Sequence, residues 1–235
     1  MKVLSWNAQG YAGQVDKFIF IKDLLNEGDY DVICIQEAGG ALGSFDQVIQ
    51  DGNPKILECK QPSRPREVSN LHNYRAIYYR WGDTNFRCSM VTYIKKDYYC
   101  SHFVYVPLTM KGIRGCLGVT IRTDVTNIII GNIHLISGVP KVAYEQFVEF
   151  RNHLSTSHKP FIIIGDFNID AISNQPLIST QNHFYPIIIN NQIIKTQKSG
   201  GCLDYAYSEI YSPSEYGILA APGDLSDHAP VFYIF

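Results

Sequence analysis

One stretch organises the rest of the chain: Phe161-Ile162-Ile163-Ile164-Gly165-Asp166-Phe167-Asn168. Four large apolar residues in a row predict a short strand that is buried on both faces. A glycine follows, at which the backbone can turn, and then come an acid and an amide two positions apart. In an extended segment, Asp166 and Asn168 would point to the same side. The alternative is a plain polar turn, because Gly, Asp and Asn are all turn formers.

The same pattern, an apolar strand followed by a polar side chain, recurs along the chain. Eight polar residues stand at predicted strand ends: Asn7, Glu37, His134, Asp166, Asn168, Asp204, Asp227 and His228. Taken singly, such an acid is often a turn or cap residue, and such a histidine is often a satisfied core residue. Strand ends that gather at one edge would instead bring all eight into one cleft, and the recurrence favours this interpretation.

Helices are predicted between the strands. The first spans 14–27 and ends at Gly28, and its apolar stripe is predicted as Val15, Phe18, Ile19, Lys22 and Leu25. The second spans 140–154 and begins at Pro140. The predicted strands lie at 3–6, 31–37, 76–79, 89–94, 98–106, 116–122, 126–134, 161–164, 203–206 and 231–235. This alternation predicts an α/β protein in which two sheets pack together and helices cover their outer faces.

The bulk composition suits a single globular unit. The chain has 235 residues, 46% of them hydrophobic, and no Pro/Gly/Ser-rich linker divides it, so one domain is predicted over residues 1–235. No apolar run approaches the about 20 residues of a membrane span. The first thirty residues show no secretory signal, which predicts either retention where the protein is made or a leader already removed.

Charge is unevenly distributed, although the net charge is only −2. Residues 55–122 hold twelve Lys and Arg against four Asp and Glu, a charge of +8, while the remainder carries −10. A basic middle inside an acidic chain predicts a local anionic partner. The alternative is ordinary scatter over solvated faces.

The chemistry of the polar set is coherent. Oxygens from Glu, Asp and Asn suit a hard cation such as Mg²⁺ or Mn²⁺. Histidines among carboxylates suit proton transfer and stabilisation of a phosphate's charge. The chain lacks the G-x-S-x-G, H-E-x-x-H, Walker A and G-x-G-x-x-G motifs, and its cysteines form no C-x-x-C pair. Metal-assisted attack of water on a phosphate ester fits best.

Six blocks, in this order, resemble the endonuclease/exonuclease/phosphatase (DNase I-like) superfamily: Ser5-Trp6-Asn7, Ile35-Gln36-Glu37, Asn132-Ile133-His134, Gly165-Asp166-Phe167-Asn168, Leu203-Asp204-Tyr205 and Ser226-Asp227-His228. Within it the chain is most similar to the B subunit of cytolethal distending toxin. Three longer stretches carry this closer likeness: Trp6-Asn7-Ala8-Gln9-Gly10, Gln36-Glu37-Ala38-Gly39 and Thr196-Gln197-Lys198-Ser199-Gly200-Gly201-Cys202-Leu203-Asp204-Tyr205-Ala206.

The resemblance implies a four-layered α/β sandwich, with two mixed or antiparallel sheets and a Mg²⁺-dependent phosphodiesterase site for which Mn²⁺ can substitute. The implied metal ligands are Glu37, Asn7 and Asp227. The implied catalytic residues are His134, Asp166, Asn168, Asp204 and His228. Asp166 would handle the attacking water, Asn168 and the histidines would contact the phosphate, and Asp204 would orient His228. The implied phosphate-binding residues are Arg87, Arg114, Asn168 and Gln9.

The resemblance also implies a biological role. The protein would be a secreted toxin that receptor-binding subunits deliver to a target cell and that cuts DNA in the nucleus of that cell. A phosphoinositide phosphatase with the same site is the alternative enzyme. A catalytically inactive binding module is a third hypothesis, against which the intact set of polar residues argues.

Overall fold

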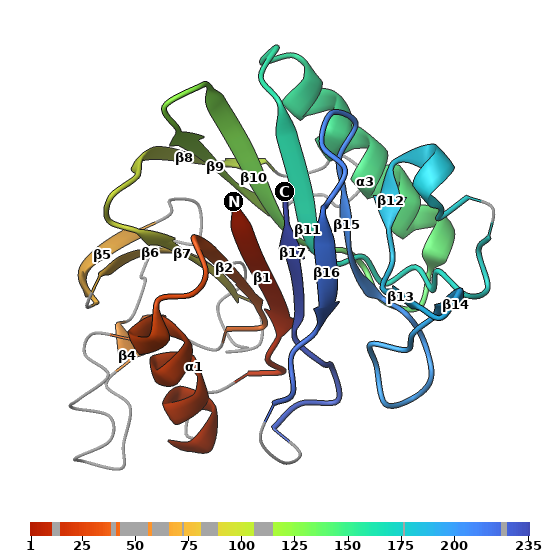
Figure 1. The fold of residues 1–235 in the computed structure, drawn as a ribbon, viewed down its shortest axis with the longest axis horizontal. Coiled ribbons are helices and arrows are strands. Elements are labelled where there is room, and N and C mark those ends of the chain that lie inside the picture. Colours follow the sequence, from red (N-terminus) through yellow and green to blue (C-terminus); the bar gives the residue numbers. More distant parts are fainter. Residues whose placement is uncertain are drawn as a thin grey trace.

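The chain forms two packed β-sheets with one helix on each outer face (Figure 1). The computed structural model describes residues 1–10, 15–38, 41–42, 56–57, 66–71, 73–80, 89–105, 115–175, 177–221 and 225–235. The two main helices are α1 (Val15–Glu27) and α3 (Pro140–Ser155), and a short 3₁₀ helix, η2, spans Thr180–Asn182. No helix in these ranges is both long and apolar enough to cross a membrane.

Each large sheet mixes parallel and antiparallel pairs. The seven-stranded sheet has the order β16 (Glu215–Ile218), β17 (Val231–Ile234), β1 (Lys2–Asn7), β2 (Val32–Gln36), β7 (Ser89–Lys95), β6 (Tyr74–Arg80) and β5 (Arg66–Leu71). The six-stranded sheet has the order β12 (Phe184–Tyr185), β15 (Asp204–Tyr207), β11 (Phe161–Asp166), β10 (Asn127–His134), β9 (Cys116–Arg122) and β8 (Tyr99–Tyr105). Two small ribbons pair β13 (Ile188–Ile189) with β14 (Gln192–Ile193), and β3 (Ala41–Leu42) with β4 (Ile56–Leu57).

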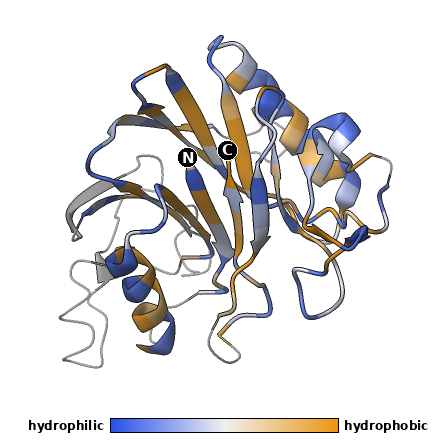
Figure 2. Ribbon diagram, viewed as in Figure 1, coloured by the Kyte–Doolittle hydropathy of each residue, from blue (hydrophilic) through white to orange (hydrophobic). Residues whose placement is uncertain are grey.

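The side chains of β11 alternate between the two faces of its sheet, so its apolar run packs against both the other sheet and a helix. On β11, Ile162 and Ile164 face the other sheet, whereas Phe161 and Ile163 face α3. All four are buried, which confirms the prediction of a strand covered on both faces. The strands are accordingly coloured mainly as hydrophobic in Figure 2. The result is the predicted four-layered α/β sandwich, in the order helix, sheet, sheet, helix.

The helices confirm the predicted positions, but one predicted stripe is wrong. In α3 the buried face consists of Ala143, Gln146, Phe147, Phe150 and Leu154. In α1 the buried residues are Lys17, Phe18, Phe20, Ile21, Leu24 and Leu25, while Ile19 is 38% exposed. The stripe is shifted because both faces of α1 carry apolar residues, so the pattern alone could not fix the helix rotation.

Two parallel strand pairs set the position of the site. The segment β1–α1–β2 forms one parallel pair, and β10–α3–β11 forms the other. In a parallel pair both strands end at the same edge of the sheet. Asn7 and Gln36 are partners at the end of the first pair, and His134 and Asp166 are partners at the end of the second.

Candidate active site

Asp166 lies at the centre of the site and is almost fully buried. Its Oδ2 accepts a hydrogen bond of 2.9 Å from Asn7 Nδ2, which comes from the other sheet. Its Oδ1 accepts one of 2.9 Å from the backbone N–H of Asn168. Both oxygens of the carboxylate are therefore fixed in direction.

The stretch that carries Asp166 and Asn168 differs from the extended segment predicted for it. Strand β11 ends at Asp166, and Asn168 has a left-handed backbone with φ of 52°. The two side chains come together through a tight turn, in which Asn168 also donates from Nδ2 to Leu135 O at 2.8 Å. Gly165 is not the turn residue. It has φ of +148°, and a Cβ there would lie 2.1 Å from Ile133 O on β10, so close strand packing requires glycine.

His134 lies between two carboxylates. Its Nε2 is 3.6 Å from Asp166 Oδ2 and 3.8 Å from Glu37 Oε1. Strand parity would direct Glu37 away from the inter-sheet space, because Gln36 already faces it. Strand β2 ends at Gln36, however, and Glu37 has φ of 48°, a left-handed turn that returns its side chain to the site.

His228 and Asp204 form a buried pair on the opposite side of Asp166. His228 Nδ1 is 2.8 Å from Asp204 Oδ2, and His228 Nε2 is 3.9 Å from Asp166 Oδ2. The backbone around His228 is held as well: its carbonyl accepts from Trp6 Nε1 at 3.0 Å, and its N–H donates to Ser226 Oγ at 3.1 Å. The carboxylate of Asp204 fixes the imidazole so that Nε2 points to the centre of the site.

The electrostatics of the centre are unusual. Burial, followed by the charge of Asp204, raises the pKa of Asp166 to about 7, although His228 and the hydrogen bonds from Asn7 and Asn168 oppose the rise. Burial lowers the pKa of His228, but Asp204 outweighs it and, with Asp166 and Asp227, raises that pKa to about 9. A buried carboxyl that titrates near neutrality beside a cationic imidazole is typical of acid/base chemistry.

The remaining predicted residues divide into two groups. Asp227 is close, with Oδ1 3.6 Å from His228 Nε2, and Gln9 is tied to it, since Gln9 Oε1 accepts from the Asp227 N–H at 3.1 Å. Arg87 and Arg114 lie outside the described residues. The structure thus brings together every predicted site residue that it describes.

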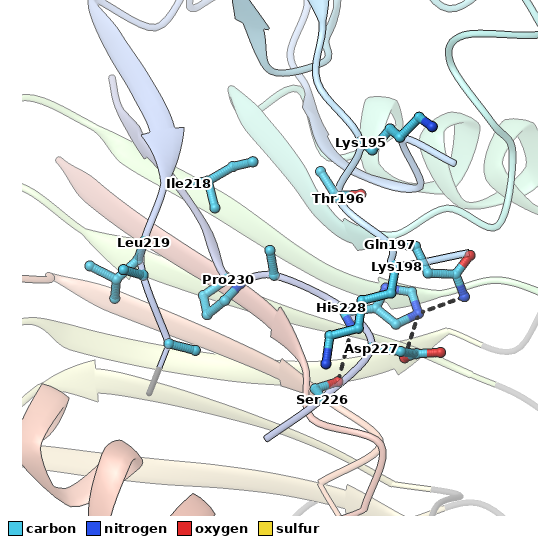
Figure 3. A pocket seen from close by; sticks show the side chains of 13 residues that line it. Lys195, Thr196, Gln197, Lys198, Ile218, Leu219, Ser226, Asp227, His228 and Pro230 are labelled. Carbon is cyan, nitrogen blue, oxygen red and sulfur yellow. Dashed lines mark hydrogen bonds and ion pairs between the residues drawn. The ribbon is translucent and has the colours of Figure 1, made fainter. Parts of the chain in front are cut away.

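Sequence reasoning missed Gln197, which contacts the site, and Lys17, which holds a loop beside it. Gln197 Nε2 lies 3.3 Å from His228 Nε2 (Figure 3). Ser199 Oγ in turn donates to Gln197 Oε1 at 2.6 Å. Lys17 is buried and donates from Nζ to the carbonyls of Ala8 and Gly10, at 2.5 and 3.1 Å. Lys17 therefore secures the loop that follows Asn7. Neither residue stands at a strand end, although Gln197 lies within one of the stretches that carry the toxin-type likeness.

A layer of polar side chains lies directly beneath the site. Gln36 donates from Nε2 to Asn132 Oδ1 at 2.8 Å and to Ser5 Oγ at 3.0 Å. Asn132 donates from Nδ2 to Val91 O at 3.1 Å and to Thr92 Oγ1 at 3.2 Å. Ser5, Gln36, Asn132 and Thr92 have no exposed surface. This layer joins the two sheets at the level where the core becomes the site.

A family model described as the endonuclease/exonuclease/phosphatase family matches residues 4–228. The chain belongs to this family. The match includes every described residue of the site, from Asn7 to His228. No curated protein sequence matches the chain.

Solved structures share the family fold at low sequence identity. The structure of CdtB, the biologically active subunit of cytolethal distending toxin, is 21% identical with a TM-score of 0.64, covering 99% of this chain and 96% of that one. The cytolethal distending toxin from Actinobacillus actinomycetemcomitans is 16% identical with a TM-score of 0.66, covering 99% of this chain and 97% of that one. The human Nocturnin catalytic domain with bound sulfate is 14% identical with a TM-score of 0.66, covering 99% of this chain and 92% of that one. These similarities support the fold.

Members of the endonuclease/exonuclease/phosphatase family are phosphoesterase hydrolases that typically use a divalent cation. Within the described ranges, Asp166, Asp204 and His228 form a group whose ligand atoms lie within 4.8 Å of one another. Asp227, which lies beside this group, has an Oδ1 that is buried and has no hydrogen-bond partner among those residues. Carboxylate oxygens in such number suit a hard divalent cation. The residues present therefore fit the metal that the family implies.

Proposed function

We propose that the chain is a Mg²⁺-dependent endodeoxyribonuclease of the cytolethal distending toxin B type. The observation that carries the proposal is the arrangement around Asp166, whose Oδ2 lies 3.6 Å from His134 Nε2 and 3.9 Å from His228 Nε2. One carboxylate between two imidazoles can take a proton from water while the imidazoles bind a phosphate. The sequence blocks around these residues add the toxin-type resemblance.

Each residue has one role in the proposed hydrolysis. Asp166, held by Asn7, accepts the proton of the attacking water. Asn168 binds the phosphate, and His134 and His228 donate hydrogen bonds to its oxygens as negative charge develops. The Asp204 carboxylate keeps His228 in one tautomer and favours its charged form.

Glu37, Asn7 and Asp227 would hold the cation. When bound, Mg²⁺ would neutralise charge on the phosphate and polarise its oxygens, and Mn²⁺ could substitute. Glu37 has a side chain only 13% exposed, and Asp227 one 36% exposed, so both carboxylates can be reached from solvent. The ligand atoms offered by these three residues are oxygens, which Mg²⁺ and Mn²⁺ prefer.

DNA is the proposed substrate, with a phosphoinositide as the alternative. The basic residues between 55 and 122 support an anionic polymer, and Arg87, Arg114 and Gln9 are proposed to contact its phosphates. The resemblance further suggests delivery by receptor-binding subunits and action in a target-cell nucleus. Co-purification with such subunits would test the first of these suggestions, and imaging of intoxicated cells the second.

Plasmid nicking tests the proposal directly. Wild-type protein should nick supercoiled plasmid with Mg²⁺ or Mn²⁺ and lose this activity in EDTA. His134→Ala should lower the rate by roughly 10²–10⁴ without unfolding the protein. A parallel assay measures phosphate release from a phosphoinositide. Release of phosphate without plasmid nicking would favour the alternative enzyme, and nicking that persists in His134→Ala would rule out the proposed roles.

A further inference from the structure

A groove of about 410 Å³ opens beside His228 and extends past it along segments that have no role in the chemistry described above (Figure 3). Its floor is residues 226–230, which include His228 and Pro230. One lip is residues 195–198 and the other is residues 218–221. This volume lies within the range of about 300–1,000 Å³ that is usual for ligand pockets. We call it the His228 groove.

Backbone hydrogen bonds tie both lips to the floor. On one side, Lys198 N donates to Asp227 O and Ala229 N donates to Thr196 O, each at 2.8 Å. On the other side, Leu219 N donates to Pro230 O at 2.9 Å. The groove is therefore pre-formed by the same segments that fix His228, and it needs no rearrangement to receive a ligand.

The two lips differ in chemistry. The first carries Lys195 and Lys198, which are exposed. In Figure 3 the Lys198 side chain extends toward Ser226, close to His228. The second lip is uncharged and apolar, formed by Ile218, Leu219, Ala220 and Ala221. The carboxylate in the lining is Asp227, which faces His228.

We propose that the His228 groove is the subsite for the nucleotide next to the scissile phosphate, an assignment that rests on the proposed nuclease function. Lys198 binds the neighbouring phosphate, and the sugar and base lie against the apolar lip. A nucleic-acid strand offers this alternation of anion and flat apolar surface at each residue. A free inositol phosphate offers only hydroxyls and anions and would leave the apolar lip without a partner, whereas the acyl chains of a phosphoinositide would cover that lip, so the assays include this lipid.

Substrate preference tests the groove separately from the chemistry. The probes are a single-stranded oligodeoxynucleotide and bis-para-nitrophenyl phosphate, which has no neighbouring phosphate. Lys198→Ala should lower the ratio of kcat/KM for the oligonucleotide over that for the small diester by about tenfold, the scale of one charged hydrogen bond. The matched control is Lys159→Ala, an exposed lysine just before β11, which should leave the ratio as in wild type.

A second variant fills the groove without removing charge. Ala220 is exposed, so Ala220→Trp should fold normally, with the urea midpoint as the check, and should lower the same ratio. An unchanged ratio in both Lys198→Ala and Ala220→Trp, in a wild type that cuts DNA, overturns the groove assignment alone. A wild type that hydrolyses the small diester but no DNA overturns the nuclease proposal and the groove with it. A lower rate on a phosphoinositide in Lys198→Ala, with the oligonucleotide ratio unchanged, reassigns the groove to a headgroup.

Discussion

Gln36 on β2 donates a hydrogen bond from Nε2 to Oδ1 of Asn132 on β10, 2.8 Å away, across the interface between the sheets. Both side chains are fully buried. Glu37 follows Gln36 directly, and His134 stands two positions after Asn132, the next inward-facing residue of its strand. A slip of one sheet relative to the other would break this bond and would separate the two site residues.

Loss of both partners of this bond should destabilise the protein by less than the sum of the two single losses. Gln36→Leu leaves Asn132 with a buried, unpaired oxygen, which should lower the free energy of unfolding by about 1–3 kcal/mol. In the double variant with Asn132→Leu, the coupling energy should be favourable, because neither end of this bond is left unpaired, although Ser5 and Thr92 each lose a partner as they do in the single variants. Urea denaturation of the two single variants and the double variant measures this, and strictly additive losses would contradict it.

Gly165→Ala should be among the most damaging changes of a glycine in the described residues. Its new methyl group would meet Ile133 O at 2.1 Å, so we expect a loss of about 3 kcal/mol or more from strain and overpacking. Gly138→Ala is the control. It also has a positive φ, of +80°, but meets no atom within 4 Å, so only the backbone strain of about 1–2 kcal/mol applies. Equal thermal midpoints for the two variants would show that close strand packing is not the cause.

Asp166→Asn should remove activity while retaining the fold. The amide keeps the shape of the carboxyl group but cannot accept a proton from water, so the nicking rate should fall by roughly 10²–10⁴. Activity and unfolding are measured on the same preparation. Near-wild-type nicking would exclude Asp166 as the base, and a collapsed urea midpoint would assign it a structural role instead.

The metal-free protein should lose stability as the pH rises from about 7 to 9. His228 has a folded pKa of about 9, above its ordinary value of 6.5, so its stabilising contribution is complete below 6.5 and is lost as the pH rises through 9. Asp166 acts in the same direction but only up to about 7. Asp204→Asn removes the main partner of His228, so it should flatten this slope. Urea titrations in EDTA check both slopes, and parallel curves for wild type and variant would contradict the assignment.

The sequence by itself determined the class of the fold and which polar residues stand at the ends of its strands. Apolar runs at 31–37, 126–134 and 161–164 are strands because nothing else buries such short, uniformly apolar segments. Polar residues at their ends had to gather once those strands ran parallel. This reasoning identified Asn7, Glu37, His134 and Asp166 without a structure.

Other features depended on contacts that no local pattern encodes. Strand β16 and the strands of 184–193 are short and paired by distant segments, so their sequences carry no period of their own. Gln197 contacts His228 from a loop, and Lys17 contacts the carbonyl of Ala8 from a helix. Only folding brings these residues together. The rotation of α1 about its axis likewise depended on the sheet against which it packs.

The stretch 161–168 shows where the two kinds of information meet. Its residues predicted a buried strand, which is confirmed, and an extended segment through Asp166 and Asn168, which is wrong because the strand ends at Asp166 and a turn follows. Gly165 is required by the carbonyl of Ile133 on the neighbouring strand, and Asn168 reaches the site through a left-handed turn. Local sequence fixes which groups stand at a strand end, whereas their direction depends on the atoms that tertiary packing brings against them.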